Sequence, residues 1–326
     1  MTATHDYLAD RAVLVTGGAG FIGSHVVDRL ARRGVRRIVV VDNLFLGKES
    51  NLDQARAAGA PVVFCCDDAS DIDRLRQIAK EHDVSVIFDM ATIPLPASLE
   101  RPQWAASTVY DLALTTAELA REGTIERLVH CSSSEVYGSA VYSPMDELHP
   151  LATRTPYAAA KAAGDLLLQS YARTFGISCA IVRPFNTYGP RQNDGNYAGI
   201  IPLTLRRLRE GQAPMIFGDG DQTRDFTYVE DTATLVVALA ELPELDDEPV
   251  NVASGQELPI RELVASLCRS VGYTGDWEWL DERPGDVRRH VAGTKRLEGL
   301  LGRHQFMDID EGMARTVEWY QDPHGR

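Results

Sequence analysis

The chain has 326 residues, of which 44% are hydrophobic, so it is long enough for one large domain or two medium ones. Its formal net charge of −14 argues against nucleic acid or a membrane surface as a partner, and an anionic ligand would need a local cluster of arginines. No apolar run approaches the ~18 residues of a membrane span. Residues 1–11 lack the apolar core of a signal peptide, and the cysteines show no Cys-x-x-Cys spacing. We therefore expect a reduced, cytoplasmic protein without a metal.

The first predicted element is residues 12–15, a short apolar run rich in β-branched residues, which indicates a buried strand. Three spaced glycines follow it, and a helical pattern then extends to residue 33. Gly17 allows a tight turn, Gly20 lets the backbone approach a ligand, and Gly23 lets the helix pack closely. The free N–H groups at the start of this helix would face a phosphate. Such a turn also occurs without a ligand. Here, however, a second predicted strand, residues 38–41, is followed by Asp42. An acid about 20 residues past the glycines is the expected partner of a ribose hydroxyl. The stretch therefore predicts dinucleotide binding.

Further strands are predicted at residues 61–66, 84–88, 127–131 and 178–182, and they alternate with helices at residues 71–82, 104–122 and 157–174. This alternation predicts an α/β fold with a Rossmann-type, doubly wound parallel sheet. Beyond residue 184 the elements are shorter: helices at 204–210, 231–241 and 260–271, and a strand at 250–252. We expect a dinucleotide-binding domain over residues 1–183 and a smaller, mostly C-terminal α/β substrate-binding domain over residues 184–326. The boundary is soft, because the two are expected to interleave.

Two groups of side chains carry candidate chemistry. Tyr157 and Lys161 lie four residues apart on one predicted helical face. A nearby cation stabilises a phenolate, so Lys161 would lower the pKa of Tyr157 toward the range of a useful base. The serines at residues 132–134 follow the predicted strand 127–131. We expect them at the same edge of the sheet as Tyr157 and Lys161, where they could supply a hydroxyl. Alone, the Tyr157–Lys161 pair is typical of a helix surface, and the serines are typical of a polar loop. Found together in a chain with a dinucleotide-binding pattern, they favour a catalytic site.

In these motifs the sequence resembles the extended short-chain dehydrogenases/reductases, in the branch of NAD-dependent nucleotide-sugar epimerases and dehydratases. The resemblance covers nearly the whole chain and rests on residues 16–23, 41–44, 133–138, 157–161, 183–191, 218–226 and 283–286. Together these motifs are specific for the family and much less so for the reaction.

The resemblance implies roles position by position. NAD would be held by Gly17, Gly20, Phe21, Ile22, Gly23, Asp42, Asn43, Asp67, Ala91, Tyr157 and Lys161. A nucleotide-diphosphate sugar would be held by Thr92, Asn186, Arg191, Arg224, Arg283 and Asp286. Asp42 would favour NAD over NADP, Tyr157 would take the proton from a sugar hydroxyl, and Ser133 would bond the same hydroxyl. In relatives, the helices corresponding to residues 104–122 and 157–174 form a four-helix interface, so a homodimer is expected.

Two departures from the family pattern concern the pocket. The usual His-Leu-Ala after the fourth strand is here Asp89-Met90-Ala91. Many relatives have an asparagine in the following helix, and residues 104–122 contain none. Both changes alter the expected shape of the nicotinamide and substrate pocket.

The family chemistry is oxidation of a sugar carbon, normally C4, with hydride passing to NAD. The 4-keto sugar then has three fates: return of the hydride to the other face, loss of water across C5 and C6, or loss of carbon dioxide. Elimination needs an additional base. Ser133-Ser134-Glu135 resembles the pattern of glucuronate decarboxylases and some dehydratases, which predicts a lyase with Ser134 and Glu135 in the catalytic set.

The alternatives differ in what they require of these residues. If Glu135 is only a loop carboxylate, the chain is a UDP-sugar 4-epimerase of the UDP-glucose or UDP-glucuronate type. A more distant alternative is a non-catalytic NAD(H)-binding sensor, but such proteins have lost the tyrosine or the lysine, and this chain keeps both. The sequence does not identify the nucleotide or the sugar.

Overall fold

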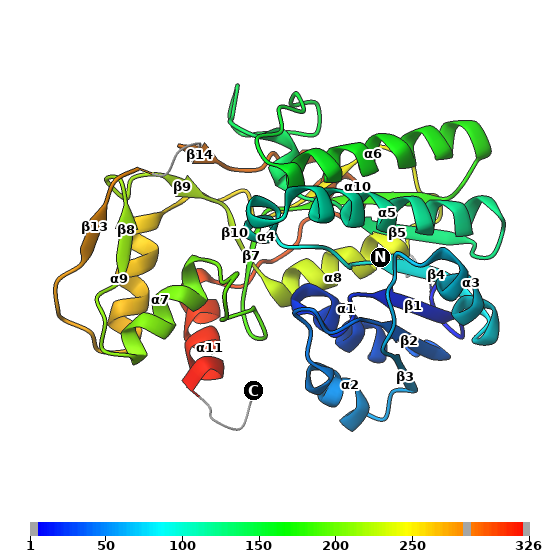
Figure 1. Cartoon of the computed structure of the whole chain (residues 1–326), viewed down its shortest axis with the longest axis horizontal. Helices are drawn as coiled ribbons and strands as arrows, with labels where there is room; N and C mark the ends of the chain where they lie inside the picture. The colour runs from blue at the N-terminus through cyan, green and yellow to red at the C-terminus, as the bar shows by residue number, and fades with distance from the viewer. Residues whose placement is uncertain (1–5, 283–287, 322–326) are drawn as a thin grey trace.

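The computed structural model describes residues 6–282 and 288–321, and a seven-stranded parallel sheet forms its centre (Figure 1). The strands are β1 Ala12–Thr16, β2 Arg37–Val41, β3 Val62–Cys65, β4 Val84–Asp89, β5 Arg127–Cys131, β6 Cys179–Pro184 and β11 Val250–Val252. Their spatial order is β11-β6-β5-β4-β1-β2-β3, and every neighbouring pair is parallel. The predicted Rossmann-type α/β fold is confirmed. The strand order reverses between β1 and β4, which is where doubly wound sheets bind ligands.

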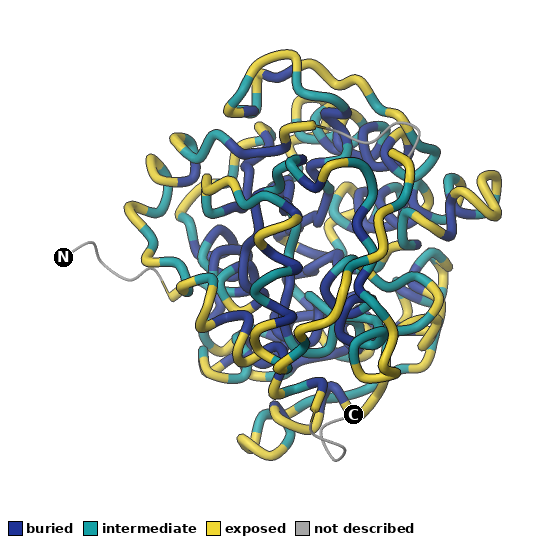
Figure 2. Tube along the Cα trace, turned by 90° about the vertical axis from the view of Figure 1, so that its left-hand side faces the viewer, coloured by how far each residue is buried: buried dark blue, intermediate teal, exposed yellow. Residues whose placement is uncertain are grey.

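Helices cover both faces of this sheet. The first face carries α1 Phe21–Ala31, α8 Val229–Ala240 and α10 Lys295–Leu301, which share one apolar core with the sheet. The second face carries α3 Ile72–Glu81, α5 Pro102–Arg121 and α6 Pro156–Phe175 around a second core. The buried centre of the molecule is visible in Figure 2. Because both faces are covered, the strands are continuous apolar runs rather than alternating ones.

A smaller lobe lies to one side of the sheet in Figure 1. It contains α7 Ile200–Arg209, α9 Ile260–Ser270 and α11 Ile309–Gln321 around a third apolar core. Short strands pair within it and at its border: β8 Met215–Phe217 with β13 Glu278–Leu280, β7 Asn186–Tyr188 with β10 Phe226–Tyr228, and β9 Thr223–Arg224 with β12 Leu258–Pro259 and β14 Arg289–His290. The chain returns from this lobe to the large sheet, because β11 pairs with β6 and α8 packs on the first face.

Several short elements lie in segments for which the sequence analysis names no helix or strand. They are the 3-10 turns η1 Glu49–Leu52 and η2 Ser134–Tyr137 and the helices α2 Asp53–Ala57 and α4 Leu95–Glu100. α4 follows Pro94, a residue compatible with a helix start because its missing N–H is not needed there. Within the described ranges, none of the helices combines the length and apolar character needed to cross a bilayer.

Candidate active site

The turn between β1 and α1 has no room for side chains at its glycines. Gly17 has φ +61°, and an added Cβ would lie 2.7 Å from the Cα of Ala91. A Cβ on Gly23 would lie 2.2 Å from the carbonyl oxygen of Gly17, so this glycine allows α1 to pack on the turn itself as well as beside the sheet. Gly20 is the N-cap of α1 and no side chain caps the helix. The backbone N–H groups of the first turn are therefore available to an anion at this edge of the sheet.

Asp42, at the end of β2, joins the glycine turn to the loop that follows it. Its carboxylate accepts hydrogen bonds from the backbone N–H of Ala19 at 3.0 Å and of Leu44 at 2.8 Å. Burial raises the pKa of Asp42, and these bonds, with one from the backbone of Gly20, oppose the increase. An added Cβ on Gly47 would lie 2.9 Å from both carboxylate oxygens, so this glycine lets the loop close over the acid.

A cavity of about 380 Å³ lies at this edge of the sheet and brings most of the predicted site together. Among its lining residues are the predicted Gly17, Gly20, Phe21, Ile22, Gly23, Asp42, Asn43, Asp67, Ala91, Thr92, Ser133, Tyr157, Lys161 and Arg191. Asp67 forms a two-pronged pair with Arg74, with both N···O distances at 3.0 Å. The cavity has the size and the mixture of apolar and polar residues that are typical of a small-molecule site.

Tyr157 is held at the cavity by polar partners from two other segments. Hydrogen bonds with the side chains of Ser133, after β5, and Thr92, after β4, act on its hydroxyl. Lys161 is 3% exposed and donates from Nζ to the carbonyl oxygen of Cys131 at 2.7 Å. α6 thus presents a phenol and an ammonium to the carboxyl ends of β4 and β5, which is the arrangement predicted from their spacing.

In this ligand-free structure burial dominates the pKa of Tyr157. Burial raises the pKa of Tyr157 far above its usual value, the charges of Cys131 and Glu135 raise it further, and the hydrogen bonds from Ser133 and Thr92 only partly oppose this. Lys161 is not among the main influences on this pKa, and its ammonium donates to the backbone of Cys131. Desolvation therefore outweighs the cation that the sequence places one helical turn away.

The two residues after Ser133 lie beside the cavity and not among its lining residues. The Oγ of Ser133 accepts a hydrogen bond from the backbone N–H of Glu135 at 3.2 Å, which starts η2. Ser134 is buried, and its backbone bonds His290 of β14. Glu135 is half-buried, and its negative charge raises the pKa of Tyr157. The Glu135 carboxylate thus lies within electrostatic range of the phenol, and Ser134 bonds a residue of β14.

Arg191, predicted as a diphosphate ligand, lines the cavity and also forms an ion pair with α1. Its guanidinium forms an ion pair with Asp28 of α1 at 2.7 Å, both side chains being less than a tenth exposed, and it donates to Gln54 at 2.8 Å. The residue has φ +67° and lines the cavity, but its charge is already neutralised. In this structure Arg191 joins the segment after β7 to α1, and its role as a diphosphate ligand stays a prediction.

Two further predicted substrate residues, Asn186 and Arg224, are not among the described residues that line the cavity. Asn186 of β7 donates to the carbonyl oxygen of Asp225 at 3.4 Å. Arg224 of β9 donates to the carbonyl oxygen of Thr223 at 2.9 Å, and its charge lowers the pKa of His290. Arg283 and Asp286 lie outside the described residues.

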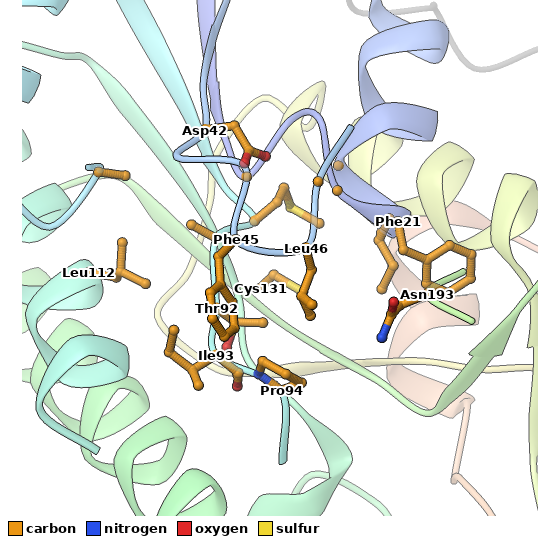
Figure 3. A pocket seen from close by; sticks show the side chains of 18 of the residues that line it. Phe21, Asp42, Phe45, Leu46, Thr92, Ile93, Pro94, Leu112, Cys131 and Asn193 are labelled. Carbon is orange, nitrogen blue, oxygen red and sulfur yellow. Dashed lines mark hydrogen bonds between the residues drawn. The ribbon is translucent and has the colours of Figure 1, made fainter. Parts of the chain in front are cut away.

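Sequence reasoning missed an apolar group that crosses the cavity. Phe45 and Leu46, in the loop after Asp42, project between the β2 end and the segment that carries Thr92 (Figure 3). The ring of Phe45 makes an edge contact with Trp104 at 5.4 Å and stacks on Tyr197 at 6.3 Å. The apolar run Leu44–Leu46, two residues after Asp42, was the available signal, but neither aromatic partner could be identified from the sequence.

Comparisons with known proteins identify the family of the chain. The profile of the NAD dependent epimerase/dehydratase family matches residues 13–253. The UDP-glucose 4-epimerase of Mycolicibacterium smegmatis is 35% identical over 311 residues, which cover 95% of this chain and 98% of that protein. The dTDP-glucose 4,6-dehydratase of an Actinoplanes species is 34% identical over 318 residues, which cover 95% and 97%.

A solved structure of a dehydratase is also similar to this chain. The double mutant of DesIV, a dTDP-glucose 4,6-dehydratase from Streptomyces venezuelae with NAD bound, superposes with a TM-score of 0.88 at 30% identity, covering 96% of this chain and 98% of that one. The glycine turn, the acid after β2 and the buried tyrosine–lysine pair are thus found in a chain similar to both epimerases and dehydratases over nearly its whole length. The protein belongs to the NAD-dependent epimerase/dehydratase family.

Proposed function

We propose that the protein is a nucleotide-sugar lyase that works through a 4-keto intermediate, most simply as a 4,6-dehydratase. The observation that carries this proposal is the set formed by Tyr157, Ser133 and Thr92 at the cavity, with the Glu135 carboxylate close enough to raise the pKa of Tyr157. The first three residues suffice for sugar oxidation. The carboxylate is the additional acid–base group that elimination requires.

NAD fits the residues of this site. The glycine turn has space only for backbone, the uncapped N-terminus of α1 suits the diphosphate, and Asp42 suits the adenosine ribose. When bound, NAD supplies the acceptor for the hydride from the sugar carbon. Asp42 would disfavour the additional phosphate of NADP, because its carboxylate lies at the ribose end of the cavity.

The side chains would divide the proton transfers as follows. Tyr157 takes the proton of the sugar hydroxyl, and Ser133 and Thr92 orient that hydroxyl. A carbonyl at C4 makes the C5 hydrogen acidic, so Glu135 takes the C5 proton and then passes it to the C6 hydroxyl, which leaves as water. The hydride would then return from the cofactor to C6 while a proton adds at C5, so that the product has lost one water and NAD would be regenerated. Tyr157 needs help to ionise, since burial raises its pKa. We propose that substrate and cofactor binding, together with the Lys161 ammonium, supply this help.

The charges of the cavity favour dehydration over decarboxylation. A uronate substrate carries a carboxylate at C5 and needs a cation beside it. Among the described residues that line the cavity, the cationic side chains are Lys161, which bonds Cys131, and Arg191, which is paired with Asp28. Both are already engaged, so a neutral hexose suits the cavity better than a uronate.

A second candidate is 4-epimerisation, and a specific observation favours it. The 35% identity to a UDP-glucose 4-epimerase is slightly higher than the 34% identity to a dehydratase. Epimerisation uses Tyr157 and Ser133 and has no need of Glu135.

The variant Glu135→Gln separates the two readings. Glutamine keeps the size and hydrogen bonding of glutamate but cannot take a proton near neutral pH. If Glu135 is the C5 base, the variant should still oxidise the sugar and accumulate reduced nicotinamide absorbance and a 4-keto sugar, while product formation falls by ~10²–10⁴-fold. Tyr157→Phe should abolish both signals, because it blocks the first step.

Glu122→Gln is the matched control. Glu122 pairs with Arg76 at the C-terminal end of α5 and is not among the residues described as lining the cavity. This variant should keep the original rate. If Glu135→Gln also keeps it, the carboxylate is a bystander and the protein is an epimerase.

A further inference from the structure

The loop after β2, residues 43–48, is fastened at both ends to the predicted cofactor turn. Near its start, the backbone N–H of Leu44 donates to the carboxylate of Asp42 at 2.8 Å. At its end, the backbone N–H of Lys48 donates to the carbonyl oxygen of Ala19 at 3.0 Å. The apolar tip between these anchors is 36–41% exposed, although the same tip contributes to the lining of the cavity. The loop thus has one side on solvent and the other on the cavity.

The tip of this loop contacts aromatic side chains from two other segments. The ring of Phe45 meets Trp104, at the start of α5, and Tyr197, in the segment between β7 and α7. Each partner has a contact of its own that holds it. The hydroxyl of Tyr197 donates to Glu100 at 3.0 Å, and the guanidinium of Arg101 lies 4.2 Å from the centroid of the Trp104 ring. The loop, α5 and the segment before α7 are therefore joined at one aromatic cluster.

This aromatic cluster belongs to the same wall of the cavity as Tyr157. Phe45, Tyr197 and Tyr157 all line the cavity. Trp104, Tyr197 and Tyr157 also pack against one small apolar core, which consists of Ile93, Ala97, Ala105, Val109 and Ala160. A ligand that reaches Tyr157 therefore lies in a space whose wall includes the contact between Phe45 and Tyr197.

The backbone of the loop adopts a conformation that leucine rarely takes. Leu44 has φ +59°, in the left-handed region, where a bulky side chain is strained. Such strain persists only where surrounding contacts maintain it, and it is concentrated at ligand clamps and other functional sites. Here Asp42 accepts from the N–H of Leu44, and the side chain of Asn43 accepts from the N–H of Phe45 at 3.0 Å. The strained turn directs Phe45 into the cavity (Figure 3), which favours a functional role for the loop.

We propose that Phe45 and Tyr197 retain the nicotinamide cofactor by closing the cavity between the β2 loop and the segment before α7. The proposed chemistry makes retention necessary, because the sugar gives up a hydride and must take it back. Loss of NADH between the two transfers would leave a sugar oxidised at C4 and a protein without cofactor. Dehydration, decarboxylation and epimerisation share this requirement, so the inference rests on the proposed function only in that a hydride leaves and returns.

The release rate of the cofactor tests this inference. Protein loaded with NADH would be mixed with a large excess of NAD, and the loss of the fluorescence of bound NADH gives the dissociation rate constant. Phe45→Ala and Tyr197→Ala should each raise this constant at least about tenfold, since each removes an aromatic contact and its apolar area. The double variant should release NADH within about threefold of the faster single variant, because both changes remove the same contact.

Phe175→Ala is the matched control. Phe175 is a phenylalanine of similar exposure, 54%, at the end of α6, and it is not among the described residues that line the cavity. This variant should release NADH at the parent rate. An equal rise in Phe175→Ala, an unchanged rate in Phe45→Ala, or single effects that multiply in the double variant would each overturn the inference.

Two further measurements keep the inference separate from folding and from the proposed reaction. If Phe45→Ala does not fold, Phe45→Leu keeps an apolar side chain but loses both ring contacts, and it should still release NADH faster than the parent; a parent rate would contradict the inference. During turnover without added NAD, Phe45→Ala should lose activity that added NAD restores, whereas the parent should keep its activity. A product of unchanged mass would contradict the proposed dehydration and would leave the expected release rates as they are.

Discussion

Gly23→Ala tests the geometry of the cofactor turn against the usual preference of helices. Alanine in a helix interior is favoured over glycine by about 1 kcal/mol. Here the new Cβ would lie 2.2 Å from the carbonyl oxygen of Gly17, 2.9 Å from its carbonyl carbon and 3.0 Å from the Cα of Gly18. These are backbone atoms, so α1 or the turn must move by more than 1 Å to reach ordinary contact at about 3.4 Å. Overpacking of this kind costs about 1–3 kcal/mol.

We therefore expect the free energy of unfolding of Gly23→Ala to be lower by about 0–2 kcal/mol despite the gain in helix propensity. The variant should also bind NAD more weakly, because Gly17, Gly20 and Gly23 all line the cavity. A displaced turn that loses about 1.4 kcal/mol of binding free energy lowers affinity tenfold, and we expect at least that. Urea unfolding and calorimetric titration with NAD measure the two quantities.

Gly299→Ala is the matched control for this experiment. Gly299 lies in α10, and no neighbouring heavy atom lies within 4 Å of an added Cβ. This variant should gain up to about 1 kcal/mol of stability and keep the NAD affinity of the parent. If Gly23→Ala behaves like Gly299→Ala in both measurements, the packing of α1 on the glycine turn does not limit the site.

Three further predictions follow from particular residues. Asp42→Ala should bind NAD more weakly and narrow the preference for NAD over NADP, measured by titration with both; equal affinities in the parent would show that Asp42 does not face the ribose. Burial and the nearby Arg191 lower the pKa of His25 to about 3, so the stability it contributes is present above its unfolded pKa of ~6.5 and is lost as pH falls toward 3. Unfolding free energies should thus fall less steeply over this range in His25→Gln, and parallel curves would refute the assignment. Light scattering should give twice the chain mass of 35.9 kDa, and Leu166→Glu, on the exposed face of α6, should halve it; a parent protein of 35.9 kDa would exclude the homodimer.

The large sheet was predictable because its signals are local. A buried parallel strand is an apolar run of a few residues, and residues 12–15 and 38–41 fall within β1 and β2. The glycine turn was predictable for the same reason, because its three glycines lie within one short segment. These local patterns also placed Tyr157 and Lys161 on one helix, at the edge where β4 and β5 end.

The charge of each site residue depends on partners that are distant in sequence. Arg191 pairs with Asp28 of α1, a partner that its own motif does not indicate. The burial that raises the pKa of Tyr157 comes from packing among separate segments, and it outweighs the lysine one turn away. The hydrogen bond between Asp89 and His130 depends on the register of β4 against β5, which neither strand specifies alone.

The most direct test of the proposed reaction is the mass of the product. The purified protein with NAD would be incubated with UDP-, dTDP-, GDP- and CDP-linked hexoses and hexuronates, and the products analysed by mass spectrometry. We predict that one neutral nucleotide hexose loses one water, and that Tyr157→Phe releases no product. A product of unchanged mass with inverted configuration at C4 would contradict the lyase and establish an epimerase. Loss of carbon dioxide from a hexuronate would contradict dehydration, and no turnover of any substrate would contradict an enzymatic role.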